Sequence, residues 1–256
     1  MNKIEEIQKQ IIECNIRNHY KENKMKRFVV GDIHGAYKAL KQCVELSHID
    51  KEKDMLFCIG DVADGWPEVP ECFNELLTFK NLIYVRGNHD EWMLNHIGDA
   101  SKPSIWLDQG GRATIDAYFQ APVDRKDELF EHLAFLRNTP YYHLTEDNKL
   151  FVHGGYNYFA EDILKNTIPD EFLWDRDLIK HALLGKQKRW LGLDKFNEVY
   201  IGHTAMRNAR VFNYHNLWNL DTGAGWKGKL TIMDIDTKEI FQSDSVEDLY
   251  PDVRGR

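Results

Sequence analysis

The chain has 256 residues, with 33 lysines and arginines against 41 aspartates and glutamates, and so a formal net charge of −8 at pH 7. This length suits one large domain, or a domain with a subdomain, that buries a substantial core. The acidic balance argues against a general nucleic-acid binder, which normally carries a basic face. No apolar run approaches the roughly 20 residues of a membrane span, so no membrane partner is expected.

Two features of the chain favour a cytoplasmic location. Residues 1–26 are polar and charged, unlike a secretory signal. The cysteines Cys14, Cys43, Cys58 and Cys72 show no CxxC spacing, and Cys43 and Cys58 lie among apolar neighbours. We therefore expect four reduced thiols in a reducing compartment.

The N-terminal half alternates short apolar runs with segments of helical periodicity. A peripheral helix is predicted over residues 4–14, within an N-terminal extension of residues 1–25. Three strands, each followed by a helix, are then predicted over residues 26–31, 36–47, 55–60, 69–79, 82–86 and 90–97 in turn. The first two of these helices are expected to bury Leu40, Cys43 and Val44, and Phe73, Leu76 and Leu77. This order implies a parallel sheet with crossover helices.

The pattern changes in the C-terminal half. Residues 101–140 predict a small helical insert, with helices over 114–119 and 126–137. Strands are then predicted over residues 141–145, 149–152, 199–201, 210–214, 217–220, 229–235 and 239–242, with a hairpin turn at residues 146–148. We expect one α/β domain over residues 26–256, built from two packed mixed β-sheets flanked by helices, with antiparallel pairing in the second half.

Short polar segments follow five of the apolar runs. They are residues 31–35 (GDIHG), 60–65 (GDVADG), 86–90 (RGNHD), 153–155 (HGG) and 202–204 (GHT), and a sixth segment is 174–176 (WDR). Ligands in open α/β sheets lie outside the carboxyl ends of the strands. We therefore expect these segments to converge on one site.

The donors in these segments predict a centre for two divalent metal ions. Asp32 and His34 lie two residues apart, so extended backbone places both side chains on one side of the chain. Asp61 has a second carboxylate oxygen that can bridge to another metal, whose remaining ligands would be Asn88, His153 and His203. Oxygen and imidazole donors without thiolate suit Mn²⁺ first, with Fe or Zn²⁺ as alternatives. Two metals that share a carboxylate typically activate a water for phosphoester hydrolysis.

Three further residues suggest how a substrate would be handled. His89 follows Asn88 and is expected to protonate the leaving oxygen rather than to bind metal. Asp64 is expected to accept the other ring N–H of His89 and so to fix its tautomer. Arg86 offers a planar fork for two phosphate oxygens, with a structural ion pair as the alternative. Trp66 is expected either in the core or as a cover over the substrate.

These segments resemble the calcineurin-like metallophosphoesterases, and in particular the bacterial and phage serine/threonine phosphatases of the PPP type. Those enzymes carry GDxHG, GDxVDRG, RGNHE, a histidine–glycine motif and a late GH motif in this order, and the match covers roughly residues 26–235. The resemblance implies an αββα sandwich and two metal ions. It places Asp32, His34 and Asp61 on one metal, Asp61, Asn88, His153 and His203 on the other, His89 with Asp64 as the acid pair, and Arg86 and Arg176 on the phosphate.

The chain departs from the family pattern at two positions. Gly65 stands where the family has an arginine, which removes a phosphate clamp and leaves the choice between monoester and diester open. Arg176 and Arg112 are the candidates to replace that clamp. Asp90 stands where the family has a glutamate, a change expected to affect only local packing.

We therefore expect a dimetal-dependent phosphomonoesterase of the serine/threonine phosphatase type, in which a metal-activated water attacks a phosphoprotein or a small phosphoester. An alternative is a phosphodiesterase or a (di)nucleoside polyphosphate hydrolase on the same fold. A more remote alternative is a scaffold that binds metal without catalysis. Turnover of a panel of phosphopeptides, nucleotides and diesters with added Mn²⁺ separates the three.

Overall fold

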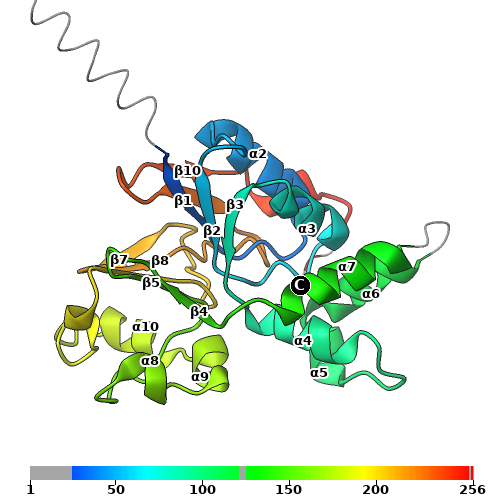
Figure 1. Cartoon of the computed structure of the whole chain (residues 1–256). Coiled ribbons are helices and arrows are strands. Elements are labelled where there is room, and N and C mark those ends of the chain that lie inside the picture. The colour runs from blue at the N-terminus through cyan, green and yellow to red at the C-terminus, as the bar shows by residue number, and fades with distance from the viewer. Residues whose placement is uncertain (1–24, 121–124, 254, 256) are drawn as a thin grey trace, which may run out of the picture.

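The computed structural model describes residues 25–120, 125–253 and 255. In this part of the chain two five-stranded sheets pack face to face, with helices on their outer faces (Figure 1). The first sheet has the order β10-β9-β1-β2-β3. Its strands are β1 (Arg27–Val30), β2 (Met55–Cys58), β3 (Asn81–Tyr84), β9 (Thr231–Asp234) and β10 (Ile240–Gln242). β1, β2 and β3 run parallel, as predicted, and β9 joins β1 in antiparallel orientation.

The second sheet has the order β4-β5-β6-β8-β7. Its strands are β4 (Tyr142–Leu144), β5 (Lys149–Val152), β6 (Glu198–Ile201), β7 (Phe212–Tyr214) and β8 (Leu217–Asn219). Only the two edge pairs, β4 with β5 and β7 with β8, are antiparallel, whereas β5, β6 and β8 are parallel. The prediction of two mixed sheets is therefore confirmed, but the expected antiparallel pairing of the second half is limited to its hairpins and to the pairing of β9 with β1.

Helices form the two outer layers and one end of the molecule (Figure 1). The first sheet is covered by α2 (Tyr37–Ser47), α3 (Val69–Leu77) and α11 (Val246–Leu249), and the second by α8 (Ile163–Asn166), α9 (Pro169–Trp174) and α10 (Asp177–Leu183). The end helices are α4 (Asn88–His96), α5 (Ser104–Trp106), the π-helical turn Leu107–Gly111, α6 (Arg112–Phe119) and α7 (Lys126–Arg137). A short 3₁₀ turn spans Leu193–Lys195.

Successive side chains of the central strands point to opposite faces of their sheet, and this divides the core into three layers. In β1, Phe28 and Val30 pack under α2 and α3, while Val29 faces the second sheet. Between the sheets, the rings of Phe57 and Phe151 stack with centroids 4.0 Å apart, and Phe151 stacks in turn on Tyr200 at 4.8 Å. Strands buried on both faces are typical of parallel sheets. This packing fixes how the strand ends of the two sheets meet.

The structure also bears on several predictions about single residues. Leu77 does not join the apolar face of α3, because its side chain is 43 % exposed. Trp66 belongs to the core, where it stacks on Tyr250 and donates to the carbonyl of Ala224. The helix predicted over residues 4–14 lies outside the described residues. Cys43, Cys58 and Cys72 are buried free thiols.

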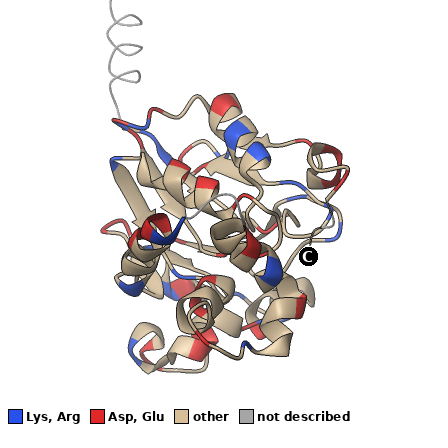
Figure 2. Cartoon of the chain, turned by 90° about the vertical axis from the view of Figure 1, so that its right-hand side faces the viewer, with Lys and Arg blue, Asp and Glu red and all other residues tan. Residues whose placement is uncertain are grey.

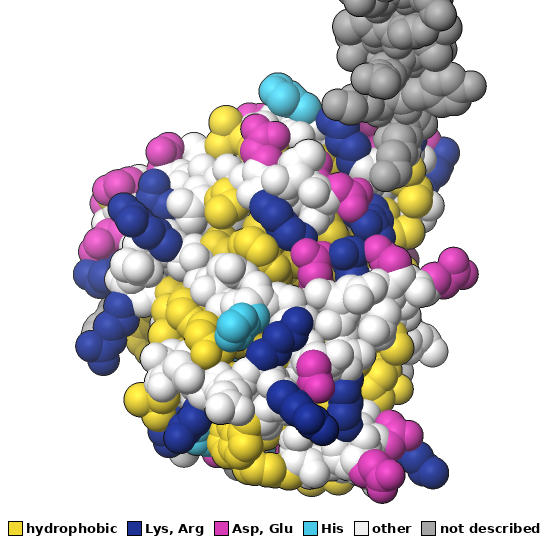
Figure 3. Space-filling view, turned by 90° about the vertical axis from the view of Figure 1, so that its left-hand side faces the viewer, with side chains coloured by type: hydrophobic (Ala, Val, Ile, Leu, Met, Phe, Trp, Pro, Cys, Tyr) yellow, Lys and Arg dark blue, Asp and Glu magenta, His cyan; other side chains and the backbone are white. Residues whose placement is uncertain are grey.

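The surface carries mixed charge. On the side that bears the end helices, acidic and basic residues alternate along the ribbon (Figure 2). On the opposite side, apolar side chains form separate patches between charged ones (Figure 3). None of the helices in the described ranges combines the length and the apolar character that crossing a bilayer requires.

Candidate active site

The predicted site residues meet where strands from both sheets end. Asp32 follows β1, Asp61 follows β2, and Asn88 begins α4 after β3. His153 follows β5 and His203 follows β6, so the second sheet supplies the imidazoles opposite the carboxylates. All of these side chains are buried. These side chains therefore come together beyond the strand ends, where the sequence predicts them.

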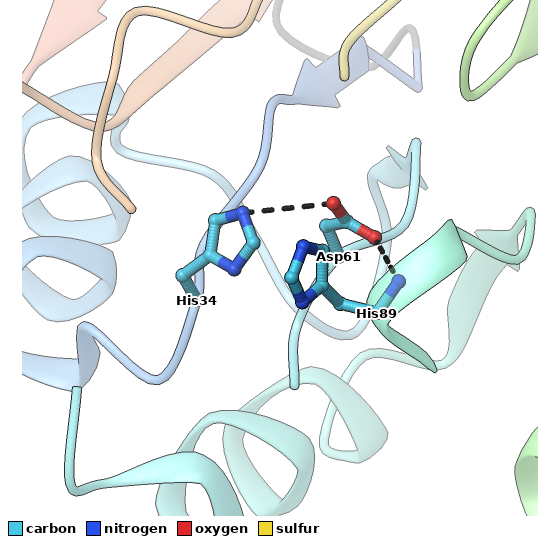
Figure 4. A group of neighbouring side chains, drawn as sticks. All are labelled: His34, Asp61 and His89. Atoms are coloured by element: carbon cyan, nitrogen blue, oxygen red, sulfur yellow. Dashed lines mark hydrogen bonds and ion pairs between the residues drawn. The ribbon is translucent and has the colours of Figure 1, made fainter. Parts of the chain in front are cut away.

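The carboxylate of Asp61 interacts with both His34 and His89 (Figure 4). Its Oδ2 is 3.6 Å from Nε2 of His34 and 3.2 Å from Nε2 of His153. Its Oδ1 accepts the backbone N–H of His89 at 2.8 Å. Asp61 also has a positive φ of 55°, and its backbone N–H is held by Asp90. The strained backbone is thus held by a hydrogen bond at the residue that lies near His34, His89, His153 and His203.

Backbone carbonyls set the tautomers of two histidines. Nδ1 of His34 lies 3.1 Å from the carbonyl oxygen of Ala63, and Nδ1 of His153 lies 2.8 Å from that of Ile59. A carbonyl only accepts hydrogen bonds, so each Nδ1 carries a proton, and Nε2 is the ring nitrogen that each histidine turns toward Asp61. This second hydrogen bond is the arrangement found behind metal-binding histidines.

The nitrogen and oxygen atoms that could ligate metal lie close together, and bound cations would stabilise this arrangement. Nε2 of His153 is 2.9 Å from Oδ1 of Asn88, and Nε2 of His203 is buried with no hydrogen-bond partner among the described residues. Burial and the nearby Asp221 carboxylate raise the pKa of Asp32 well above its ordinary value. Burial lowers the pKa of His153, but Asp61 outweighs it and raises that pKa to about 9. The Asp61 carboxylate that raises the pKa of His153 and the unpartnered Nε2 of His203 are both groups that a bound cation would satisfy.

Two groups of side chains bring ligand atoms within 4.8 Å of one another: His34, Asp61 and His89, and Asp61, His153 and His203. They share Asp61, as predicted for a bridging carboxylate. Asp32 is absent from the first group, and its oxygens accept the backbone N–H of His203 at 3.0 and 3.3 Å. His89 is present there although the sequence analysis assigns it to proton transfer.

Glycines allow the backbone to approach these carboxylates. A Cβ on Gly87 would collide with Oδ1 of Asp61, and a Cβ on Gly202 would collide with Oδ1 of Asp32. Both glycines belong to the segments recognised in the sequence. The close approach explains why the residue type is needed at these two positions.

His89 and Asp64 form a buried pair. Nδ1 of His89 is 2.7 Å from Oδ2 of Asp64. The end helices hold the carboxylate from its other side, because Nε1 of Trp106 and Oγ1 of Thr114 donate to it at 2.9 and 2.7 Å. The predicted insert thus supports the orientation of His89. Trp106 and Thr114 carry no motif, and sequence reasoning missed them.

Asp90 has a larger role than the local packing expected of it. Its carboxylate accepts the backbone N–H groups of Asp61, Val62, Ala63 and Gly87, and the hydroxyl of Tyr84, at 2.8–3.1 Å. Burial and the Asp61 charge raise the pKa of Asp90 to about 6, against the lowering effect of these donors. Asp90 therefore ties the loop after β2 to the start of α4. Its place three residues after Gly87, in a capping box, was the available signal.

Asp90→Asn is expected to lower both Tm and activity. The amide offers one acceptor oxygen in place of two, so at least two buried N–H groups lose their partner. Each such loss costs about 1–3 kcal/mol, which predicts a fall in Tm of roughly 5–20 °C by thermal denaturation. Asp99→Asn makes the same change at an exposed position and serves as the control. Equal Tm values for both variants and the wild type would contradict this role for Asp90.

The structure corrects the assignment of Arg86 to the phosphate. Arg86 is only 7 % exposed, and its Nη1 pairs with Glu91 at 2.7 Å. Its Nη2 donates to the carbonyls of Leu136 and Thr139 at 2.6 and 3.0 Å, at the C-terminal end of α7. The guanidinium therefore fastens α7 to α4, which is the structural alternative weighed above. The direction in which the Arg86 side chain points could not be predicted from the sequence.

Arg176 and Arg112 differ as possible substitutes for the missing clamp. Arg112 lies in an exposed ion pair with Asp108 at 3.5 Å. Arg176 is exposed, and its guanidinium has no hydrogen-bond or ion-pair partner in the described part of the chain. Burial, His153 and the charge of Arg176 lower the pKa of His203 well below its ordinary value, which places Arg176 near the site. Gly65 has a φ of 97°, a conformation that disfavours an arginine there.

Fold and site together define the class, a metal-dependent phosphatase whose buried carboxylates and imidazoles lie at the strand ends of two packed sheets. The profile described as calcineurin-like phosphoesterase matches residues 25–222. The chain belongs to this family, whose members depend on two metal ions.

Two curated relatives cover most of the chain. Serine/threonine-protein phosphatase 1 of Salmonella typhimurium is 28% identical, over 80% of this chain and 89% of that protein. The symmetrical bis(5'-nucleosyl)-tetraphosphatase of Coxiella burnetii is 26% identical, over 84% of this chain and 90% of that protein. A solved serine/threonine phosphatase from Saccharomyces cerevisiae has a TM-score of 0.57 at 16% identity, over 91% of this chain and 83% of that one. This last likeness shows the fold alone.

Proposed function

We propose that the protein is a phosphomonoesterase of the serine/threonine protein phosphatase type that acts on a phosphoprotein or a small phosphoester. The observation that carries the proposal is the His89–Asp64 pair, 2.7 Å apart, whose histidine belongs to the same group of ligand atoms as Asp61. A proton donor fixed beside a centre for two metals suits a substrate whose leaving oxygen needs a proton.

The residues present fit two divalent ions. Asp32, His34 and Asp61 would hold one, and Asp61, Asn88, His153 and His203 the other, with Mn²⁺ as the first candidate and Fe or Zn²⁺ as alternatives. Such a pair lowers the pKa of a water and neutralises charge on the phosphoryl oxygens. Support comes from Nε2 of His34 and Nε2 of His153, which both face Asp61.

The side chains themselves supply proton transfer and orientation. His89 delivers its proton to the leaving oxygen, and Asp64 holds the ring through Nδ1 so that Nε2 does the transfer. Trp106 and Thr114 keep Asp64 from turning away. The charge of Arg176, which helps to lower the pKa of His203, would stabilise phosphoryl oxygens of a bound dianion.

The second candidate is a (di)nucleoside polyphosphate hydrolase or a phosphodiesterase. Gly65 favours it, because a substrate with less charge on the reacting phosphate needs fewer arginine clamps. The relative from Coxiella burnetii, named a bis(5'-nucleosyl)-tetraphosphatase, favours it as well. Both candidates require the same metal centre.

The deciding experiment compares kcat/KM for a matched aryl monoester and diester. The protein is first stripped of metal by a chelator and then reloaded with Mn²⁺. We expect turnover only after reloading, with the monoester preferred. Full turnover by stripped protein would overturn the metal centre, and a diester preference would promote the second candidate. Metal binding without turnover of any substrate would identify a scaffold.

Arg176→Ala is expected to raise KM for monoesters more than for diesters. A charge-assisted hydrogen bond contributes about 1.5–3 kcal/mol, so KM for a monoester dianion should rise by about 10- to 100-fold. A diester carries one charge fewer and should lose less. Arg112→Ala removes an exposed arginine from the end helices and is the matched control. Equal effects on both ester classes would show that Arg176 does not replace the clamp missing at Gly65.

A further inference from the structure

Two tryptophans line the site beside the proton donor. Trp92 lies one helical turn after His89 in α4, with ring centroids 5.0 Å apart and planes at 81°. Trp174, at the end of α9, lies 4.8 Å from Trp92 and 5.8 Å from the ring of His203. The two indoles therefore form one continuous aromatic wall, which extends from the ring of His89 to the ring of His203. This wall joins the layer of end helices to the layer that covers the second sheet.

The side chain of Trp174 is not part of the hydrophobic core. Phe172 and Leu173, its predecessors in α9, are buried, but Trp174 itself is 38 % exposed. A tryptophan in contact with a polar site and with solvent offers apolar area that no core residue covers. Exposed aromatic surface of this kind is typical of a ligand site.

The segment that carries Trp174 is fixed in place. The backbone N–H of Gly154 donates to the carbonyl of Phe172 at 2.7 Å, which joins the end of α9 to the loop that follows β5. The carboxylate of Asp175 accepts the N–H of Leu178 at 2.9 Å and starts α10. These hydrogen bonds hold the turn that carries Trp174 in place. Little conformational entropy of the protein is therefore lost when a ligand stacks on the Trp174 ring.

The position of the wall defines which part of a substrate it meets. His89 acts on the leaving oxygen, so the group attached to that oxygen passes Trp92 and Trp174. The wall is uncharged, and Arg176 is the cation of its segment, two residues beyond Trp174. An uncharged planar surface suits a planar aromatic leaving group better than a chain of further phosphates.

Resting on the proposed phosphomonoesterase activity, we propose that Trp92 and Trp174 are specificity-determining residues that stack on an aromatic ring in the leaving group of the phosphoester. The ring is either bonded directly to the leaving oxygen, as in an aryl ester, or one sugar away, as in a nucleoside phosphate. Phosphoesters with small aliphatic leaving groups use the same metal centre without this contact.

The test is the effect of Trp174→Leu on substrates that differ in the ring. A phosphotyrosine peptide, the same peptide with phosphoserine, and a nucleoside 5'-monophosphate are compared by kcat/KM in the Mn²⁺-loaded protein. Loss of stacking should lower kcat/KM by about 5- to 100-fold for the substrate that carries the recognised ring. The phosphoserine peptide should change by less than about 2-fold, and the losses for the other two substrates identify the ring. Equal losses for all three, or none, would overturn the proposal.

A matched control and a second readout separate specificity from folding. Trp190 is 39 % exposed in another aromatic cluster with Tyr158 and His181, so Trp190→Leu makes the same change elsewhere. Trp174→Phe should recover most of the loss, because it keeps a ring. Binding of benzylphosphonate and butylphosphonate, measured by calorimetry, should show the same selective loss in Trp174→Leu.

The binding readout also separates this inference from the proposed function. Absence of turnover of every monoester by the wild type would refute the phosphomonoesterase, while selective benzylphosphonate binding that depends on Trp174 would still support the wall. Turnover of monoesters with equal binding of the two phosphonates would refute the wall alone.

Discussion

Asp61→Asn is expected to lower kcat by about 10³-fold or more and to reduce the bound metal below two ions per chain. Asp61 faces Nε2 of both His34 and His153, so the amide weakens both metal positions together. The metal pair stabilises charge in the transition state by several kcal/mol, and each 1.36 kcal/mol corresponds to a factor of ten in rate. The measurements are kcat on an aryl monoester and metal content by elemental analysis.

Asp234→Asn is the matched control for this variant. Asp234 is also a buried aspartate, but its carboxylate accepts backbone N–H groups in the β9–β10 turn, at 2.8 and 2.9 Å from Asp236 and Thr237. It should retain both metal ions and most of the activity. Wild-type metal content and kcat in Asp61→Asn would refute the bridging role.

His89→Asn is expected to lower kcat by roughly 10²–10⁴-fold, the usual contribution of general acid catalysis. The loss should be largest for an alkyl ester and should shrink for an aryl ester with a good leaving group, because a more acidic leaving oxygen depends less on proton transfer. Asp64→Asn should show the same dependence on the leaving group with a smaller loss, because the ring remains but its orientation is no longer held. Initial rates across a series of leaving groups give the measurement.

His215→Asn provides the control, since His215 lies in the β7–β8 turn at a φ of 55°, which asparagine tolerates. It should leave the rates unchanged. A loss that is the same for every leaving group, or a loss of metal from His89→Asn, would assign His89 to the ligand set instead. That outcome is a real test, because His89 shares a group of ligand atoms with His34 and Asp61.

The parallel half of the fold could be predicted because its signals are local. Apolar runs in β1, β2 and β3 and the periodicity of α2 and α3 are complete within each element. The helices α8, α9 and α10 could not be predicted in the same way, because they span only four to seven residues and show no full apolar period. The parallel pairing of β5, β6 and β8 depends on long-range packing, which hairpin signals do not report.

Some residues of the candidate site could likewise be predicted from local sequence, and others could not. Residues that follow a strand, such as Asp61 and His203, could be placed together because strand ends fix their positions. Side chains that act across the fold could not. The guanidinium of Arg86 turns toward α7, and Trp106 reaches Asp64 from 42 residues away, neither of which is encoded in neighbouring sequence. Asp90 was underestimated because its partners are backbone groups, which no motif names.

The hydrogen bond from the backbone of His203 to Asp32 spans 171 residues, and the pairing of Phe28 in β1 with Asp234 in β9 spans a still longer stretch. Chains emerge from the ribosome at about 5–20 residues per second, N-terminal end first. Asp32, His34 and Asp61 therefore wait several seconds for the imidazoles of the second sheet and for the strand that completes the first. The cluster around Asp61 is therefore completed late, and an aborted translation product carries its carboxylates without the imidazoles that they meet in the folded chain.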